Sequence, residues 1–313
     1  MAAMEGRLAR RIRATLASLL AVALTGTVLV APARAENVEG IPNWPELLPP
    51  LPGVPAGTVP LDFDVCAKGR PRCPRRVVAE MYERWRPLDR SCDHRAVFAL
   101  TYLRTTEEFV RTVTADPDFF TGWRWVNHED AVFGELYFRA YDRWAKGRPV
   151  PAAWRIAFEA ARSPNLTAIG DLLLGMNAHI NRDLPYTLAH VGLVNRKGES
   201  RKRDHDRVNG FLERVADPLQ IELARRYDRL FTLTDAEPSP LDEITVLQAV
   251  RVFRENAWRN AERLVAARSE AARRRVSASI ELEAAVGARL ITLANTIPGY
   301  GAVRDAHCRA RFS

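Results

Sequence analysis

Apolar residues recur every three or four positions along most of the chain, which is the spacing of one face of an α-helix. The segments with this pattern are residues 74–86, 93–114, 127–147, 152–162, 170–185, 204–216, 219–233, 240–264 and 277–297. No stretch alternates apolar and polar residues as a half-buried strand does, and the sequence contains no repeat or heptad array. The pattern predicts an all-α protein, a single large array of roughly eight helices with no significant sheet.

Residues 170–185 form the most apolar segment beyond residue 35 that also carries chemically reactive side chains. We expect this helix to end at Pro185, because proline disfavours the helical conformation in the residue before it. Its predicted core face consists of four side chains at a spacing of four: Leu172, Met176, Ile180 and Leu184. The segment therefore predicts a helix with one face in the core and a polar site centred on residues 175–185.

A polar stripe lies beside this predicted core face. Asp171, Gly175, His179 and Asp183 also recur every four residues. His179 and Asp183 are therefore one turn apart on one face, beside or inside apolar packing. Asp183 falls in the last turn, where the helix dipole disfavours an anion. We expect a group that compensates its charge, which is a protonated His179, an arginine or a metal ion.

Histidines stand beside carboxylates in other predicted helices as well. His128 is followed by Glu129 and Asp130, and His205 lies between Asp204 and Asp206. All-helical proteins often build metal sites from such residues on facing helices, and these ligands suit zinc, manganese or iron. A bound ion would lower the pKa of a water and supply a hydroxide nucleophile. The alternative for each pair is an ordinary ion pair or a helix cap.

The candidate metal ligands are His179, Asp183, His128 and Asp130. The cofactor that they suggest is a divalent metal such as zinc. Asp206 and Glu255 are the candidate catalytic groups: Glu255 is a ligand or general base if it faces inward, and part of a solvated face if it faces outward. The sequence lacks Gly-x-Ser-x-Gly, a phosphate-binding glycine loop and His-Glu-x-x-His, so serine hydrolases, nucleotide-binding proteins and zincins lose support.

Other polar residues interrupt the apolar segment 170–185. Asn177 and Asn181 form a second pair at a spacing of four. We interpret them as a buried bridge to a facing helix, because asparagine inside an apolar helix is unfavourable unless it is hydrogen-bonded. Arg182 is placed to bind an anionic ligand or, as is more common, to pair with Asp183.

The first 35 residues have the features of an export signal. Four arginines between residues 7 and 13 precede an apolar run over residues 14–30, and Ala33 and Ala35 fit the small-x-small cleavage pattern. We expect a secreted, extracellular protein that is cleaved near Ala35. The alternative is an uncleaved anchor, because the apolar run is near the lower limit for a membrane span. No later segment is long and apolar enough to span a membrane.

Removal of this signal lowers the net charge of the protein. It takes away five basic residues and one acidic residue, which lowers the net charge from +8 to +4. Such a balanced charge argues against a nucleic-acid partner. A small-molecule or envelope ligand is the remaining expectation.

Residues 36–65 are rich in proline and predict an extended leader. It is either a spacer from the membrane or wall or, as we favour, an ordered strap on the protein surface. The rest of the chain, residues 66–313, is long enough for one large core, and we expect a single all-α domain there.

Four cysteines follow the leader: Cys66, Cys73, Cys92 and Cys308. An even number in an exported chain indicates two disulfides, for which three connectivities are possible. Cys66 and Cys73 enclose a short loop and are the expected partners, which pairs Cys92 with Cys308. The sequence contains no Cys-x-x-Cys, so a zinc ribbon or a thioredoxin-type site is not indicated.

Four short motifs carry a resemblance to a known family: Gly175-Met-Asn-Ala-His-Ile-Asn-Arg-Asp-Leu-Pro185, His128-Glu-Asp-Ala-Val-Phe133, Asp206-Arg-Val-Asn209 and Arg254-Glu-Asn-Ala-Trp258. With them, residues 74–297 resemble the domain of unknown function family numbered 5995, helical proteins common in actinobacteria. The resemblance implies an all-helical fold and a polar site. It adds Asn209, Arg254 and Trp258 to the polar candidates, and it implies no activity.

The His-x-x-x-Asp spacing of His179 and Asp183 is also similar to a ligand pair in zinc-dependent phospholipase C and related secreted nucleases. Those enzymes use more histidines than this chain offers, and a metal-binding mature N-terminus. The expected mature start here, Glu36 and Asn37, departs from that pattern.

Two functions follow from the sequence. The first is a secreted metal-dependent hydrolase, with His179 and Asp183 as ligands and other polar residues completing the site. The second is a non-catalytic binding or structural protein of the cell envelope, whose polar cluster fixes the packing of its helices. The bonding partners of His179 and Asp183 distinguish the two.

Overall fold

The computed structural model describes residues 44–48, 53–233 and 240–312, so the expected export signal, residues 1–35, lies outside the described residues. Helices carry most of the described chain, and the paired extended residues within it form two isolated bridges rather than a sheet. The prediction of an all-α protein built as one helical array is confirmed. None of the described helices combines the length and the apolar character needed to cross a membrane.

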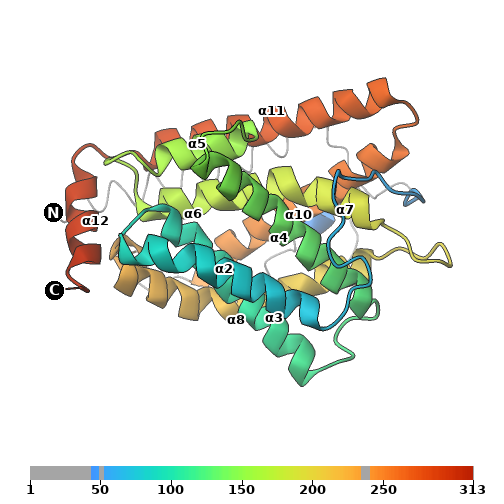
Figure 1. Cartoon of the computed structure of the whole chain (residues 1–313), viewed down its shortest axis with the longest axis horizontal. Coiled ribbons are helices and arrows are strands. Elements are labelled where there is room, and N and C mark those ends of the chain that lie inside the picture. The colour runs from blue at the N-terminus through green and yellow to red at the C-terminus, as the bar shows by residue number, and fades with distance from the viewer. Residues whose placement is uncertain (1–43, 49–52, 234–239, 313) are drawn as a thin grey trace.

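The helices follow one another through short connections. In chain order they are η1 (Trp44–Leu47), α2 (Arg72–Arg90), α3 (Arg95–Ala115), α4 (Trp123–Ala145), α5 (Ala152–Ala160), α6 (Ala168–Met176), η2 (Asn177–Asp183), α7 (Leu184–Val191), α8 (Lys202–Arg226), α9 (Leu230–Leu233), α10 (Pro240–Ala266), α11 (Glu270–Asn295) and α12 (Tyr300–Arg309). Figure 1 shows α11 along one long side of the molecule and α2, α3 and α8 along the opposite side. The central elements α4, α6 and α10 lie between these two sides.

Two disulfides join distant parts of this array. Cys66 is bonded to Cys73 in the first turn of α2, with 6.1 Å between the Cα atoms. Cys92, which follows α2, is bonded to Cys308 of α12, with 6.0 Å between the Cα atoms. Both pairings are those expected from the sequence, and they fit an extracellular protein.

The core consists of two apolar clusters. One includes Trp154 and Leu174, and the other includes Trp258 and Leu188, all of them almost completely buried. Phe133, in the middle of α4, packs against both clusters. Polar groups beside Phe133 are therefore enclosed by apolar side chains from two directions.

Residues 53–65 form an extended segment, here called the strap, that lies over the helices. The backbone N–H of Val59 donates to the carbonyl of Ala189 (2.8 Å), and that of Leu61 donates to the imidazole of His190 (3.0 Å). Figure 1 shows the strap running beside α7. The described part of the Pro-rich leader is thus held to the end of α7 by both backbone and side-chain bonds.

The central segment differs from the single helix that was expected to end at Pro185. α6 passes directly into η2, and α7 continues to Val191. η2 is a π-helix, in which the N–H of Leu184 donates to the carbonyl of His179, five residues earlier. Pro185 lies in the first turn of α7, a position where a missing N–H is tolerated.

The buried face of this segment also differs from the expectation. Three of the four predicted core residues are only partly buried: Leu172, Met176 and Ile180. The polar stripe is buried throughout: Asp171, Gly175, His179 and Asp183. Apolar periodicity located the helix but chose the wrong face, because the polar side chains find bonding partners inside the fold.

Gly175 shows why this face packs so closely. A Cβ at that position would lie only 2.6 Å from the Cβ of Phe98 on α3. We expect Gly175→Ala to lower the free energy of unfolding by about 1–3 kcal/mol, because overpacking forces shifts in a dense core. Urea denaturation measures the effect. Gly210→Ala on α8 is the control, since an added Cβ there meets nothing within 4 Å; equal effects of the two substitutions would contradict the expectation.

Candidate functional site

The Asp183 carboxylate, at the centre of the expected site, is fully buried and bonded on both oxygens. Its Oδ2 accepts from the indole N–H of Trp154 on α5 (2.8 Å), and its Oδ1 accepts from the guanidinium of Arg182 (2.8 Å). Arg182 also donates to Glu281 on α11 (2.8 Å). The group that compensates Asp183 is therefore an arginine, one of the three alternatives expected. This polar chain joins α5, η2 and α11.

His179 lies one turn before Asp183, with 3.5 Å between its Nδ1 and the Oδ2 of the acid. Its ring stacks on Phe133, with 3.5 Å between centroids, and lies 4.4 Å from the ring of Tyr102. Burial lowers the pKa of His179 more than Asp183 raises it, so the imidazole is neutral at pH 7. Its Nε2 is buried and has no hydrogen-bond partner among the described residues.

The two asparagines of η2 form a bridge to α11. The side-chain amide of Asn177 donates to the carbonyl of Ala284 (2.8 Å), and Asn181 donates to the Oδ1 of Asn177 (3.0 Å). This is the arrangement that the sequence led us to favour. A Cβ at Gly287 would lie 2.8 Å from the Oδ1 of Asn177, so the bridge also depends on a close approach of α11.

A second polar group joins α4, α8 and α10 inside the protein. The Nε2 of His205 donates to the carbonyl of Arg254 (3.2 Å), and the Arg254 guanidinium donates to the carbonyl of His205 (2.7 Å). Glu129 approaches the same imidazole, with 3.6 Å between its Oε1 and Nδ1. Burial and then the neighbouring Arg254 lower the pKa of His205 well below its usual value. Motifs that are far apart in the sequence thus meet here.

Two adjacent acids on α4, Glu129 and Asp130, each have one buried carboxyl oxygen without a hydrogen-bond partner among the described residues. Burial, opposed by Arg254, raises the pKa of Glu129 to about 7. Burial and then the neighbouring Glu129 raise the pKa of Asp130 to about 8. The hydroxyl of Tyr102 is also buried without a described partner. Both acids therefore carry protons over part of the neutral pH range.

The two candidate catalytic acids, Asp206 on α8 and Glu255 on α10, share one lysine. The Nζ of Lys202 is 2.5 Å from Asp206 and 2.8 Å from Glu255. Glu255 also accepts from Arg259 (2.9 Å). Glu255 is buried, so it faces inward, and burial raises the pKa of Asp206. Their nearest partners are cations of the protein itself.

The remaining polar candidates are separate from these groups. Trp258 is fully buried, and its indole N–H donates to a glutamate one turn later (2.8 Å). The Oδ1 of Asn209 is buried and has no partner among the described residues. Asp204 accepts from the two backbone N–H groups just before α4 (2.9 and 2.6 Å). The first N–H groups of a helix have no acceptor within the helix, and the Asp204 carboxylate on α8 is the acceptor for the start of α4.

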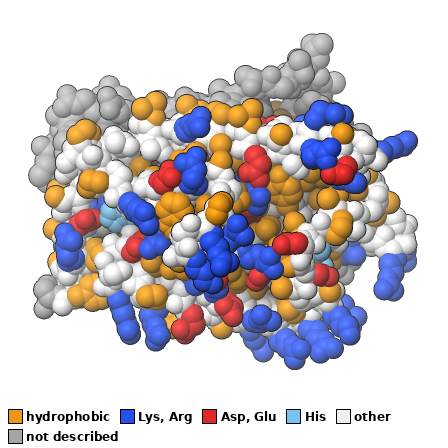
Figure 2. Space-filling view, turned by 45° about the horizontal axis from the view of Figure 1, so that its top comes forward, with side chains coloured by type: hydrophobic (Ala, Val, Ile, Leu, Met, Phe, Trp, Pro, Cys, Tyr) orange, Lys and Arg blue, Asp and Glu red, His pale blue; other side chains and the backbone are white. Residues whose placement is uncertain are grey.

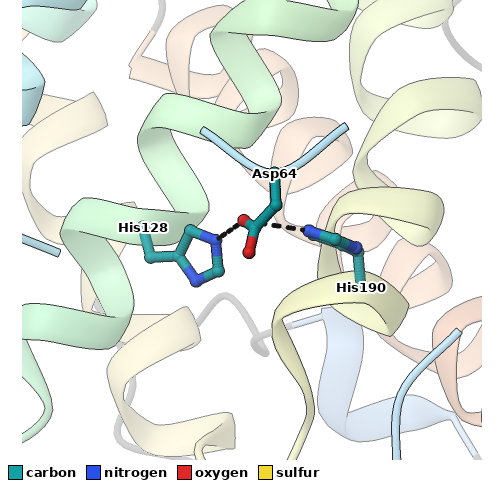
Figure 3. Close-up of side chains that lie close together, drawn as sticks. All are labelled: Asp64, His128 and His190. Atoms are coloured by element: carbon teal, nitrogen blue, oxygen red, sulfur yellow. Dashed lines mark hydrogen bonds and ion pairs between the residues drawn. The ribbon is translucent and has the colours of Figure 1, made fainter. Parts of the chain in front are cut away.

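Three side chains from separate segments meet where the strap crosses the helices: Asp64 of the strap, His128 of α4 and His190 in the last turn of α7 (Figure 3). One ligand atom of each lies within 4.8 Å of the others, and no second group of three or more His, Cys, Asp or Glu gathers so closely in the described part of the chain. The Oδ1 of Asp64 is 2.7 Å from the Nε2 of His128 and 3.3 Å from that of His190. We call these three residues the clasp site.

Hydrogen bonds assign the protons at the clasp site. The N–H of Leu61 donates to the Nδ1 of His190, so the proton of the neutral ring is on Nε2, which donates to Asp64. Burial alone would raise the pKa of Asp64, but the hydrogen bonds from His128 and His190 hold it below its usual value. Asp64 is therefore a carboxylate that accepts from two imidazoles.

Sequence reasoning selected His128 but missed Asp64 and His190 as its neighbours. It paired His128 with Asp130, yet residues two apart do not share a helix face. His128 accordingly contacts the strap, whereas Asp130 contributes a buried oxygen to the interior. A usable signal was the position of Asp64 two residues before Cys66, since a disulfide there holds this end of the leader against the helices.

The fold and these sites define an all-helical, disulfide-bonded protein with polar clusters where its helices meet. The family model described as "Family of unknown function (DUF5995)" matches residues 75–294. The chain belongs to this family, which confirms the resemblance seen in the sequence. No curated protein and no solved structure matches it.

Proposed function

We propose that the protein is a non-catalytic helical protein of the cell envelope, whose buried polar cluster fixes the packing of its helices. The bonding of Asp183 carries this proposal, because both of its oxygens accept hydrogen bonds from Trp154 and Arg182 in a closed core. Both oxygens thus bind side chains of the protein itself, and the Asp183 side chain has no contact with solvent, as expected for a group that holds helices together. Its role in the proposal is to hold α5, η2 and α11 in one register.

The proposed location is outside the cytoplasm, after cleavage near Ala35. The two disulfides and the predicted export signal support this location. On the face drawn in Figure 2, basic side chains are interspersed with acidic and apolar ones. Such a mixed surface suits an envelope ligand or partner better than a nucleic acid.

The competing function is a secreted metal-dependent hydrolase, with His179 and Asp183 as ligands and acids from other helices completing the site. Two of those acids have a partner in the protein, since Asp206 and Glu255 share Lys202. The ring of His179 is also packed against the aromatic rings of Phe133 and Tyr102. These contacts favour the non-catalytic function.

His179→Gln is expected to leave the amount of bound divalent metal unchanged, because the imidazole packs between aromatic rings and holds no ion in this proposal. Elemental mass spectrometry of the purified mature protein, after dialysis against zinc, measures the metal content. Wild type and variant are also expected to hydrolyse ester and phosphodiester substrates no faster than buffer with zinc.

The control for this experiment is His94→Gln, which removes another histidine that is bonded to a carboxylate, Asp305 (2.8 Å). Zinc-dependent turnover by the wild type that His179→Gln abolishes and His94→Gln preserves would overturn the proposed function. The same conclusion would follow if only His179→Gln lost one equivalent of metal.

A further inference from the structure

The clasp site has the residue types of a small metal centre. Two imidazoles and one carboxylate are a common set of three protein ligands for zinc, with a water as the fourth. Metal–ligand distances of about 2.0–2.1 Å place tetrahedral ligand atoms about 3.3 Å apart. The Oδ1 of Asp64 and the Nε2 of His190 are already separated by 3.3 Å. The Nε2 of His128, 2.7 Å from the same oxygen, would have to move away slightly.

The charge of Asp64 is not compensated by a basic side chain. Within the described residues, its ion-pair partners are the two imidazoles, and no lysine or arginine pairs with it. Asp62, two residues earlier in the strap, differs because it pairs with Arg139 (3.3 Å). A carboxylate that no described lysine or arginine neutralises attracts a cation.

The clasp site is open on one side. The side chain of Asp64 is 47% exposed, whereas those of His128 and His190 are 14% and 8% exposed. The imidazoles are thus mostly covered by the surrounding protein, and the carboxylate is partly open to water. Figure 3 shows the carboxylate of Asp64 between the two imidazoles. An ion can enter from the solvent side without opening the core.

We propose that Asp64, His128 and His190 bind one divalent ion of the zinc class, and that this ion fastens the strap to α4 and α7. This role goes beyond the packing role of Asp183, because a different set of residues carries it. Nitrogen and oxygen ligands of this kind suit zinc better than calcium or magnesium, which take oxygen ligands.

Ion binding has a specific consequence for the strap. A neutral imidazole that binds a metal through Nε2 carries its proton on Nδ1. The proton of His190 must therefore move from Nε2 to Nδ1, where the N–H of Leu61 now donates. Two N–H groups cannot face each other, so the Leu61 N–H leaves the ring. His128 likewise carries its proton on Nδ1 when its Nε2 binds the ion, and Asp64 binds as a carboxylate. Each neutral ring thus keeps one proton, and none is released.

The experiment is calorimetric titration of zinc into the mature protein without a histidine tag. We expect one equivalent to bind, and each of Asp64→Asn, His128→Gln and His190→Gln to weaken binding at least about tenfold. Hydrogen exchange followed by NMR is expected to show faster exchange of the Leu61 amide in the zinc-bound wild type. Circular dichroism confirms that each variant is folded.

His94→Gln is the matched control, because His94 also bonds a single carboxylate but has no second imidazole in its group. It should bind zinc like the wild type, and so should His179→Gln. The proposal is overturned if the wild type binds no zinc, or if folded clasp variants bind it normally. Unchanged exchange of the Leu61 amide at zinc saturation also overturns it, and this readout needs no variant.

The two proposals fail in different ways. Zinc-dependent turnover lost with His179→Gln contradicts the non-catalytic function, whatever happens at the clasp site. Normal zinc binding by His190→Gln contradicts the clasp metal, whatever His179 does. One equivalent of zinc at the clasp site without turnover agrees with both.

Discussion

Replacing Asp183 with alanine is expected to lower the free energy of unfolding by about 3–5 kcal/mol, the usual cost of removing one partner of a buried ion pair. Two donors lose their acceptor at once, the indole N–H of Trp154 and the guanidinium of Arg182. A buried donor without a partner costs about 1–3 kcal/mol by itself. Urea denaturation followed by circular dichroism measures the loss.

Glu281→Gln provides the control for this substitution. Glu281 is the outer partner of Arg182, and its side chain is 32% exposed. Its replacement is expected to cost less than about 1 kcal/mol, as for other ion pairs near the surface. If Asp183→Ala costs no more than Glu281→Gln, Asp183 does not hold the helices together, and the proposed function loses its main support.

The segment around Asp183 shows what apolar spacing predicts and what it misses. Spacing located a helix over residues 170–185 and placed His179 and Asp183 one turn apart, both of which agree with the structure. It did not reveal the π-helix, because a single i→i+5 turn changes no residue type. Apolar spacing also predicted the less buried face as the core face. It takes no account of hydrogen-bond partners such as Trp154, which allow Asp183 to be buried.

Long-range contacts set a second limit on what the sequence predicts. The pairing of Cys92 with Cys308 was predictable, because few cysteines leave few alternatives. The clasp site was harder to predict, because Asp64 is one of many acids in a segment without helical periodicity, and only its closeness to Cys66 indicates that it lies against the helices. Its position depends on the path of the strap over α7, which no local pattern encodes.

The acids Glu129 and Asp130 lead to the second large effect, which depends on pH. Burial raises the pKa of Asp130 to about 8 and that of Glu129 to about 7, against ordinary values of 3.8 and 4.5. Because the folded state holds these protons more tightly, the acids stabilise the fold fully below their ordinary pKa values. That contribution declines as the pH rises and is lost above the raised values. His205, whose pKa is lowered, acts oppositely and only below about pH 6.5.

We therefore expect the free energy of unfolding of the wild type to fall by about 4 kcal/mol between pH 6 and pH 9. At about 1.4 kcal/mol for each pKa unit, Asp130 accounts for about two units of this fall and Glu129 for about one. Asp130→Asn removes the larger part of this decline, because an amide cannot ionise, and leaves only the smaller part that comes from Glu129. The variant should be more stable than the wild type at pH 9. Urea denaturation at each pH measures both. Glu135→Gln, on the same helix in an ion pair with Arg139, should keep the wild-type slope. A wild type whose stability is flat over this range, or an Asp130→Asn variant that keeps the slope, would mean that Asp130 is already ionised and compensated inside the fold.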